Sequence, residues 1–186
     1  MLETIIIACL VAKIKGYDIK PLFKSWTIYP IIIMEVINCV VQIMIFSDNY
    51  TAVSYLAKSK SFYLAIYLCL VFKYELYGSA LIGSVFMIGG GLLNDIAIKA
   101  NNGFMPVYPT LSYLTGYTKP EMFKVVQDIH ILGNADTNLK ILTDFIDLGY
   151  SVLSIGDILI RVFVFLIIYN AIKKSNLMTT GGERRC

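Results

Sequence analysis

The chain alternates between long apolar runs and short polar segments over most of its length. The apolar runs cover residues 2–15, 26–46, 61–77, 78–98 and 157–172. A helix needs about 20 apolar residues to cross a hydrocarbon core about 30 Å thick, and most of these runs approach that length. The pattern therefore predicts an all-α, polytopic transmembrane helical bundle of about five spans.

Two of these runs differ in how well they fit a membrane span. Residues 2–14 would rise only about 20 Å as a helix, so this segment spans only if Lys13 and Lys15 snorkel or the bilayer thins. Residues 26–46 are the strongest span, because Trp26 is suited to one interface and Pro30 falls in the first turn, where its missing N–H costs little.

Small residues distinguish the fourth run. Ser79 and Gly83, like Ala80 and Ser84, are spaced so that a neighbouring helix backbone can approach closely. Three consecutive glycines, residues 89–91, then weaken the helix. We expect either a kink or a tight helix crossing there.

Residues 99–156 form a polar excursion without a run long enough to span. Thr118 and Glu121 have the spacing of a capping box, which predicts a short amphipathic helix to about Ile131. Asn101-Asn102-Gly103 is typical of a turn that tolerates positive φ. We treat residues 1–176 as a single integral membrane domain and predict a disordered cytoplasmic tail over residues 177–186.

Composition and charge support a membrane protein. The chain is 57% apolar and only 16% charged, and its net charge of +3 is too small to indicate nucleic-acid binding. Nine basic residues fall in the short segments of one side and six in the longer segments of the other, so the excursion is predicted to be extracytoplasmic and the C-terminus cytoplasmic. Cys9, Cys39 and Cys69 lie in apolar stretches and predict no disulfide framework or zinc site.

Ionisable and amide side chains flank the excursion. Asp157 and Arg161 are spaced i,i+4 and can pair on one helix face, with Asp95 as a further partner of Arg161. Stabilisation of the excursion explains this group more simply than a ligand or proton site. Asn94 and Asn101 are weaker binding candidates.

His130 is the single histidine. With Asp144, Asp147 and Asp157 it supplies the side chains of an acid–base pair or a metal site. No His-x-x-x-His or Glu-x-x-His spacing exists, so a hydrogen-bonded structural histidine is the better interpretation, and we predict no metal or cofactor. Glu35, inside the second run, either pairs with Lys or Tyr of a neighbouring helix or handles protons or cations.

Motifs between residues 94 and 161 add a family resemblance. An Asn is followed by an Asn-Gly segment closing on Met-Pro, then by a His, a Thr, an Asp, and Ser-Ile-Gly-Asp before the last helix. These positions are Asn94, Asn101, Gly103, Met105, Pro106, His130, Thr137, Asp144, Ser154, Gly156 and Asp157. The chain thereby resembles an uncharacterised bacterial family of small integral membrane proteins, which implies a family and no mechanism.

Three interpretations of function follow. The first is a non-enzymatic accessory or complex subunit in the cytoplasmic membrane of a bacterium, acting in the lipid bilayer with a membrane-protein partner or as a homodimer. The second is a transporter or permease-type module, which the lack of an internal repeat disfavours. The third is a membrane-embedded hydrolase or metal enzyme using His130 and Asp157, with Asp144 as a further catalytic candidate.

Overall fold

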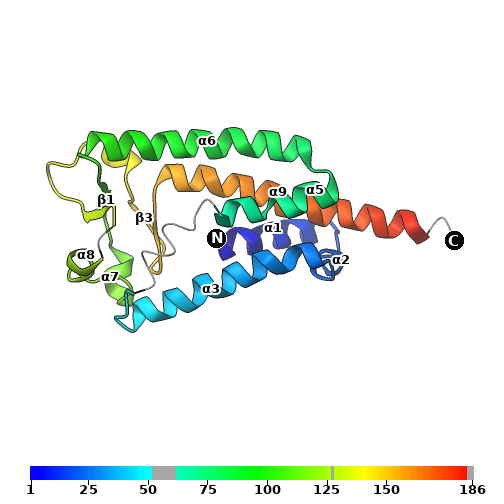
Figure 1. Cartoon of the computed structure of the whole chain (residues 1–186), viewed down its shortest axis with the longest axis horizontal. Helices are drawn as coiled ribbons and strands as arrows, with labels where there is room; N and C mark the ends of the chain where they lie inside the picture. Colours follow the sequence, from blue (N-terminus) through cyan, green and yellow to red (C-terminus); the bar gives the residue numbers. More distant parts are fainter. Residues whose placement is uncertain (52–61, 127, 184–186) are drawn as a thin grey trace. The chain divides into compact units, whose positions relative to one another are not determined.

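A computed structural model of the chain describes residues 1–51, 62–126 and 128–183. The chain is mostly helical, with two small two-stranded sheets between the last two long helices (Figure 1). The α-helices are α1 (Leu2–Ile14), α2 (Lys20–Phe23), α3 (Tyr29–Phe46), α5 (Leu68–Tyr74), α6 (Tyr77–Ala100), α7 (Leu111–Thr115), α8 (Met122–Val125) and α9 (Ile155–Glu183). The strands are β1 (Met105–Val107), β2 (His130–Leu132), β3 (Ile146–Asp147) and β4 (Val152–Leu153), and two 3-10 turns are η1 (Trp26–Ile28) and η2 (Lys140–Leu142).

Several helices match the predicted spans. Within the described residues, three are long and apolar enough to cross a membrane: Trp26–Phe46, Tyr77–Ala100 and Ile155–Thr179. A shorter apolar helix covers Phe62–Tyr74, whereas Ser61, the predicted start of that span, lies outside the described residues. These helices confirm a multi-pass membrane protein. The count of five spans stays a prediction, because α1 has only 13 residues.

The chain divides into two compact units. Unit 1 contains Met1–Val36, Ser61–Phe86 and Arg161–Cys186, and unit 2 contains Ile37–Lys60 and Met87–Ile160. The helices α3, α6 and α9 therefore each contribute residues to both units.

Unit 1 is a packed group of apolar helices. Its core includes Tyr67 and Leu70 from the α5 region and Ile167 and Ile168 from α9, none of which is exposed. Helix α6 meets α9 closely, because a Cβ on Gly83 would lie 2.9 Å from the Phe163 ring. This contact uses one of the small residues that the sequence predicts at a close helix approach.

Unit 2 contains a second close approach of α6 and α9. A Cβ on Gly90 would lie 2.3 Å from the backbone oxygen of Gly156, and a Cβ on Gly156 would lie 2.5 Å from the backbone oxygen of Gly90. Helix α6 continues without interruption through the three glycines to Ala100. Of the two predicted consequences of the glycine run, the structure has the tight crossing.

The polar segment between α6 and α9, residues 101–154, is called the cap below. In it, β1 and β2 pair in parallel, with Met105 opposite His130, and Val107 also bridges to Asp144. Strands β3 and β4 form a short antiparallel pair. The predicted turn after α6 is confirmed, since Asn102 and Gly103 have φ angles of 57° and 88°.

Three features of the secondary structure differ from the prediction. The all-α assignment misses the strands of the cap, which at two or three residues are too short to show an alternating pattern. The helix predicted from Thr118 to about Ile131 is reduced to α8, because residues 130–132 pair with β1 instead. Helix α9 extends to Glu183, beyond the predicted domain boundary at residue 176, while residues 184–186 lie outside the described part of the chain.

Candidate functional site

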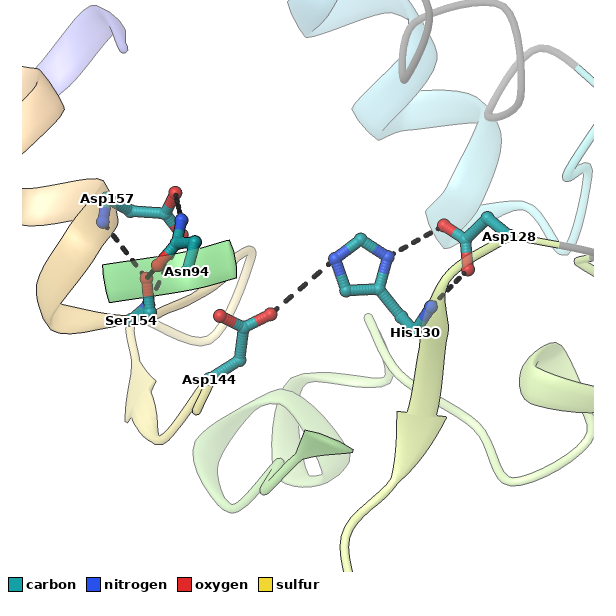
Figure 2. Close-up of polar contacts among 6 residues, drawn as sticks. All are labelled: Asn94, Asp128, His130, Asp144, Ser154 and Asp157. Carbon is teal, nitrogen blue, oxygen red and sulfur yellow. Dashed lines mark hydrogen bonds and ion pairs between the residues drawn. The ribbon is translucent and has the colours of Figure 1, made fainter. Parts of the chain in front are cut away.

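Two groups of polar side chains in unit 2 are drawn in Figure 2. The helix-end cluster consists of Asn94 on α6 with Ser154 and Asp157 at the start of α9. The histidine group consists of Asp128, His130 and Asp144. Together they contain four of the candidate residues that the sequence singled out.

The helix-end cluster is a reciprocal cap of α9. The Asp157 N–H donates to Ser154 Oγ at 3.0 Å, and the Ser154 N–H donates to an Asp157 carboxylate oxygen at 3.2 Å. This is a capping box, and it places a carboxylate at the helix N-terminus, where the helix dipole favours it. Because both donors would otherwise lack partners, Asp157 has a structural role in this geometry.

Asn94 joins this cap to α6. Its Oδ1 accepts from the Ser154 hydroxyl at 2.7 Å, and its Nδ2 donates to Asp157 at 3.3 Å. The backbone approaches so closely that a Cβ on Gly156 would lie 2.1 Å from Asn94 Oδ1. A glycine at 156 is therefore required for the asparagine to reach both partners.

In the histidine group, one imidazole contacts two carboxylates. Asp128 accepts from the His130 backbone N–H at 2.9 Å and lies 2.8 Å from the ring Nδ1. On the other side, His130 Nε2 is 3.6 Å from Asp144 Oδ2. The side chain of Asp144 is only 6% exposed, whereas His130 is 28% exposed, so solvent reaches the ring but hardly reaches the carboxylate.

This arrangement can hold and transfer a proton. Neutral imidazole carries one N–H, which the 2.8 Å contact favours at Nδ1, and leaves Nε2 as an acceptor. A protonated ring has a donor for each of the two carboxylates. The two ring nitrogens point to different carboxylates, and the described residues contain no group of three or more His, Cys, Asp or Glu that could hold a metal ion.

Asp147 supports the cap in a different way. Its carboxylate accepts from the backbone N–H groups of Thr110 at 2.6 Å and Ser112 at 2.8 Å, and from the Gly149 N–H at 2.8 Å. Burial alone would raise the pKa of Asp147, but these hydrogen bonds and one from the Ser112 hydroxyl hold the pKa below its usual range. The charged form of Asp147 therefore fastens β3 to the start of α7.

Asn101 has a similar bridging role. Its Oδ1 accepts from the Asn138 N–H at 2.9 Å, and its Nδ2 donates to the Asn138 backbone oxygen at 3.0 Å and to the Ala97 oxygen at 2.8 Å. The side chain thus ties the end of α6 to a distant loop. Asp95 is exposed, and its side chain forms no hydrogen bond or ion pair within the described residues.

Unit 1 contains the two remaining candidates. Arg161 pairs with Glu3 at 2.9 Å, whereas the sequence predicts Asp157 as its partner. Glu35, only 6% exposed, accepts a hydrogen bond from the Tyr63 hydroxyl, which lies 2.7 Å from the Tyr67 hydroxyl. Glu35 thus has a tyrosine partner, which is one of the two roles that the sequence predicts for it.

Sequence reasoning missed Asp128 and did not assign Ser154 to the site. Ser154 had a detectable signal, because Ser-x-x-Asp before an apolar run is a capping-box pattern. Asp128 had none, since its contact with His130 depends on the local turn that precedes β2. The Tyr63–Tyr67 pair was visible only as an i,i+4 spacing in an apolar helix.

These features define a class of protein: a multi-pass membrane protein whose described residues include three long apolar helices and a hydrogen-bonded polar cap. The chain belongs to a family of unknown function, DUF5317, whose pattern matches residues 19–169. The match includes all three candidate spans up to Tyr169 and the whole cap. No curated protein and no solved structure matches the chain.

Proposed function

We propose that this chain is a non-enzymatic accessory subunit of a membrane-protein complex, and that its cap contacts the partner. The observation that carries the proposal is the use of the polar side chains. Asn94, Asn101, Asp147 and Asp157 each bond to groups of the same chain that hold the cap together. These hydrogen bonds favour a structural task over a catalytic one for these candidate residues.

The surface of the cap supports the same proposal. Large apolar side chains are exposed on it, with Leu114 84% and Ile141 66% exposed. The others are Phe104, Leu111, Tyr113, Ile129, Ile131, Leu132, Leu139 and Phe145. Apolar side chains in such numbers on a segment this short are typical of surfaces that contact a partner.

The proposal includes five spans with the cap extracytoplasmic and the C-terminus in the cytoplasm of a bacterium. Two contacts in unit 1 support a first span. Glu3 pairs with Arg161, and the Asp18 N–H donates to Asn176 at 2.8 Å. Helix α1 and the turn after it therefore lie along α9 from Arg161 to Asn176, and the two helices run in the same direction. This stretch of α9 is about 22 Å long.

A contact in unit 2 supports the span before α6. Lys119 of the cap pairs with Asp48, just after α3, at 2.6 Å, so the end of α3 lies on the cap side. The end of α6 also leads directly into the cap. The chain between α3 and α6 must then cross back, and Phe62–Tyr74 is the apolar helix available for that crossing.

Cysteine labelling tests this topology. In a variant without the natural cysteines, single cysteines replace Asp48, Asp136 or Lys20, which are all exposed. A membrane-impermeant maleimide should label positions 48 and 136 in intact cells, and position 20 only after permeabilisation. Labelling of position 48 only after permeabilisation would refute the five-span arrangement, because only three helices would then cross.

Photo-crosslinking tests the subunit role. A photoreactive amino acid in place of Leu114 should give one discrete protein adduct in native membranes, and the same group in place of the exposed polar Asp136 provides the control. An adduct with lipid alone would show that the cap lies on the bilayer. An adduct with a second copy would show a homodimer. Either result would refute a separate partner.

A hydrolytic function is the alternative, and the histidine group is the observation in its favour. Asp128 orients His130, as an acid–base histidine requires, although Asp157 bonds within the helix-end cluster instead. If the alternative holds, His130→Ala should leave the abundance of the protein unchanged and abolish an activity of the cell membrane. Loss of abundance alone would support the structural role.

A further inference from the structure

A cavity of about 250 Å³ lies in unit 1 beside the start of α6 and the last turns of α9. It is lined by Glu75, Leu76, Gly78, Ser79, Asn170, Lys173, Lys174 and Leu177. Small-molecule sites usually measure about 300–1,000 Å³, so this cavity suits a headgroup-sized molecule. One candidate span begins at Tyr77 and another ends at Thr179. The cavity beside these two helix ends therefore lies at a membrane–water interface.

The lining separates donors from acceptors. Lys173 and Lys174 contribute two ammonium groups, and neither belongs to an ion pair among the described residues. Ser79 adds a hydroxyl. The Glu75 carboxylate is an acceptor on the lining. The Asn170 side chain adds a second acceptor, because its Nδ2 donates to the Leu166 oxygen at 2.8 Å and its Oδ1 is left to accept.

This balance selects a class of ligand. Two lysines attract a phosphate, as basic pockets between membrane helices do for lipid headgroups. A multiply charged headgroup would meet repulsion from Glu75, whereas a phosphate that carries its own ammonium would find an acceptor there. A trimethylated ammonium has no N–H to donate and would lose that hydrogen bond.

We propose that this cavity binds the headgroup of an ethanolamine-type phospholipid. The phosphate lies against Lys173 and Lys174, and the ammonium donates to Glu75 and Asn170. The two features that carry this assignment are the headgroup-sized volume of this open cavity and the presence of both charges on its lining. The acyl chains extend beside the exposed apolar face of α6, where Leu81 and Ile82 are exposed.

Native mass spectrometry of the full, delipidated chain in detergent tests the proposal. The probes are phosphatidylethanolamine, phosphatidylcholine and phosphatidylglycerol with the same acyl chains, and inorganic phosphate. The wild type should retain phosphatidylethanolamine in preference to the other two lipids. Replacing both lysines, K173Q with K174Q, should lower its affinity about thirtyfold, and Glu75→Gln should remove the preference for ethanolamine over choline.

A matched double variant, K13Q with K15Q, removes two exposed lysines from the end of α1 and should bind like the wild type. Thermal unfolding of each variant shows whether it remains folded. Equal retention of phosphatidylethanolamine by the wild type and the K173Q, K174Q variant would overturn the proposal. Tighter binding of phosphatidylglycerol would overturn the role of Glu75. Displacement of the lipid by millimolar inorganic phosphate would show a free-phosphate site instead.

Discussion

The crossing of α6 and α9 in unit 2 makes one of three consecutive glycines far more sensitive to substitution than the other two. A Cβ on Gly90 would lie 2.3 Å from the Gly156 oxygen and 3.1 Å from Leu159 and Ile160 side-chain atoms. The first of these is a backbone atom, so no side-chain rotation relieves the clash. For Gly89 and Gly91, nothing lies within 4 Å of an added Cβ.

Two opposing effects determine how much Gly90→Ala changes the free energy of unfolding. Gly→Ala inside a helix gains up to about 1 kcal/mol from propensity. At Gly90 the helices must move apart by roughly 1 Å to restore ordinary contact, and overpacking of this kind costs about 1–3 kcal/mol or more where backbone is involved. Because the clash at Gly90 is with backbone, the cost lies near the upper end of this range, and after the gain in propensity we expect Gly90→Ala to lower the free energy of unfolding by about 2 kcal/mol. Gly89→Ala and Gly91→Ala should leave it unchanged or slightly raised.

Thermal unfolding in detergent measures this difference. A thiol-reactive dye reports unfolding through Cys9, Cys39 and Cys69, which are partly buried in the folded chain. For a chain of this length, 1 kcal/mol corresponds to about 2–4 °C, so Gly90→Ala should lower the Tm by about 4–8 °C. If the Gly90→Ala and Gly89→Ala variants have the same Tm, the close crossing does not exist and the reasoning fails.

Three further predictions concern the polar contacts. Ser154→Ala should lower the free energy of unfolding by about 1–2 kcal/mol. The double variant with Asn94→Ala should lose less stability than the two single variants add up to, and denaturant titration of all four proteins measures this difference. Tyr63→Phe should destabilise unit 1 by about 1–3 kcal/mol because Glu35 loses its donor, and Glu35→Gln in the same chain should recover part of this loss in thermal unfolding. The folded pKa of Asp147 lies below the ordinary aspartate value of 3.8, so its stabilisation is present above about pH 4 and is lost as the pH falls through the folded pKa; limited proteolysis of the cap should increase there, and Asp147→Asn should remove this pH dependence.

The long helices could be predicted from the sequence because lipid imposes a length and a composition on each one. Runs of apolar residues predict Trp26–Phe46 and Tyr77–Ala100 almost to the residue. The close approach of α6 was also foreseeable, since glycine and serine at helical spacing in a membrane helix are typical of a close contact with a second helix. The member of the glycine run that touches α9 depends on helix rotation, which a single sequence does not reveal.

The cap was less predictable for a physical reason. Its strands contain two or three residues, and its stabilising bonds join segments far apart in the chain, such as Asn101 with Asn138 or Asp147 with Thr110. Nothing in the local pattern around Ile129 distinguishes a strand from an amphipathic helix, and the pairing with β1 decides between them. His130 was among the candidate residues, whereas Asp128, two residues before it, was not, because their contact depends on the local bend of the chain that leads into β2.

The parallel pairing of β1 with β2 sets an order of events during biosynthesis. Parallel strands cannot join through a tight turn, and here Val107 must also meet Asp144 before the pairing is complete. Contacts of such long sequence separation form late. The last contact, that of Ser154 with Asn94 on α6, can form only after the chain has reached the start of α9. Synthesis of the start of the last helix is then the step that completes the hydrogen bonding of the cap.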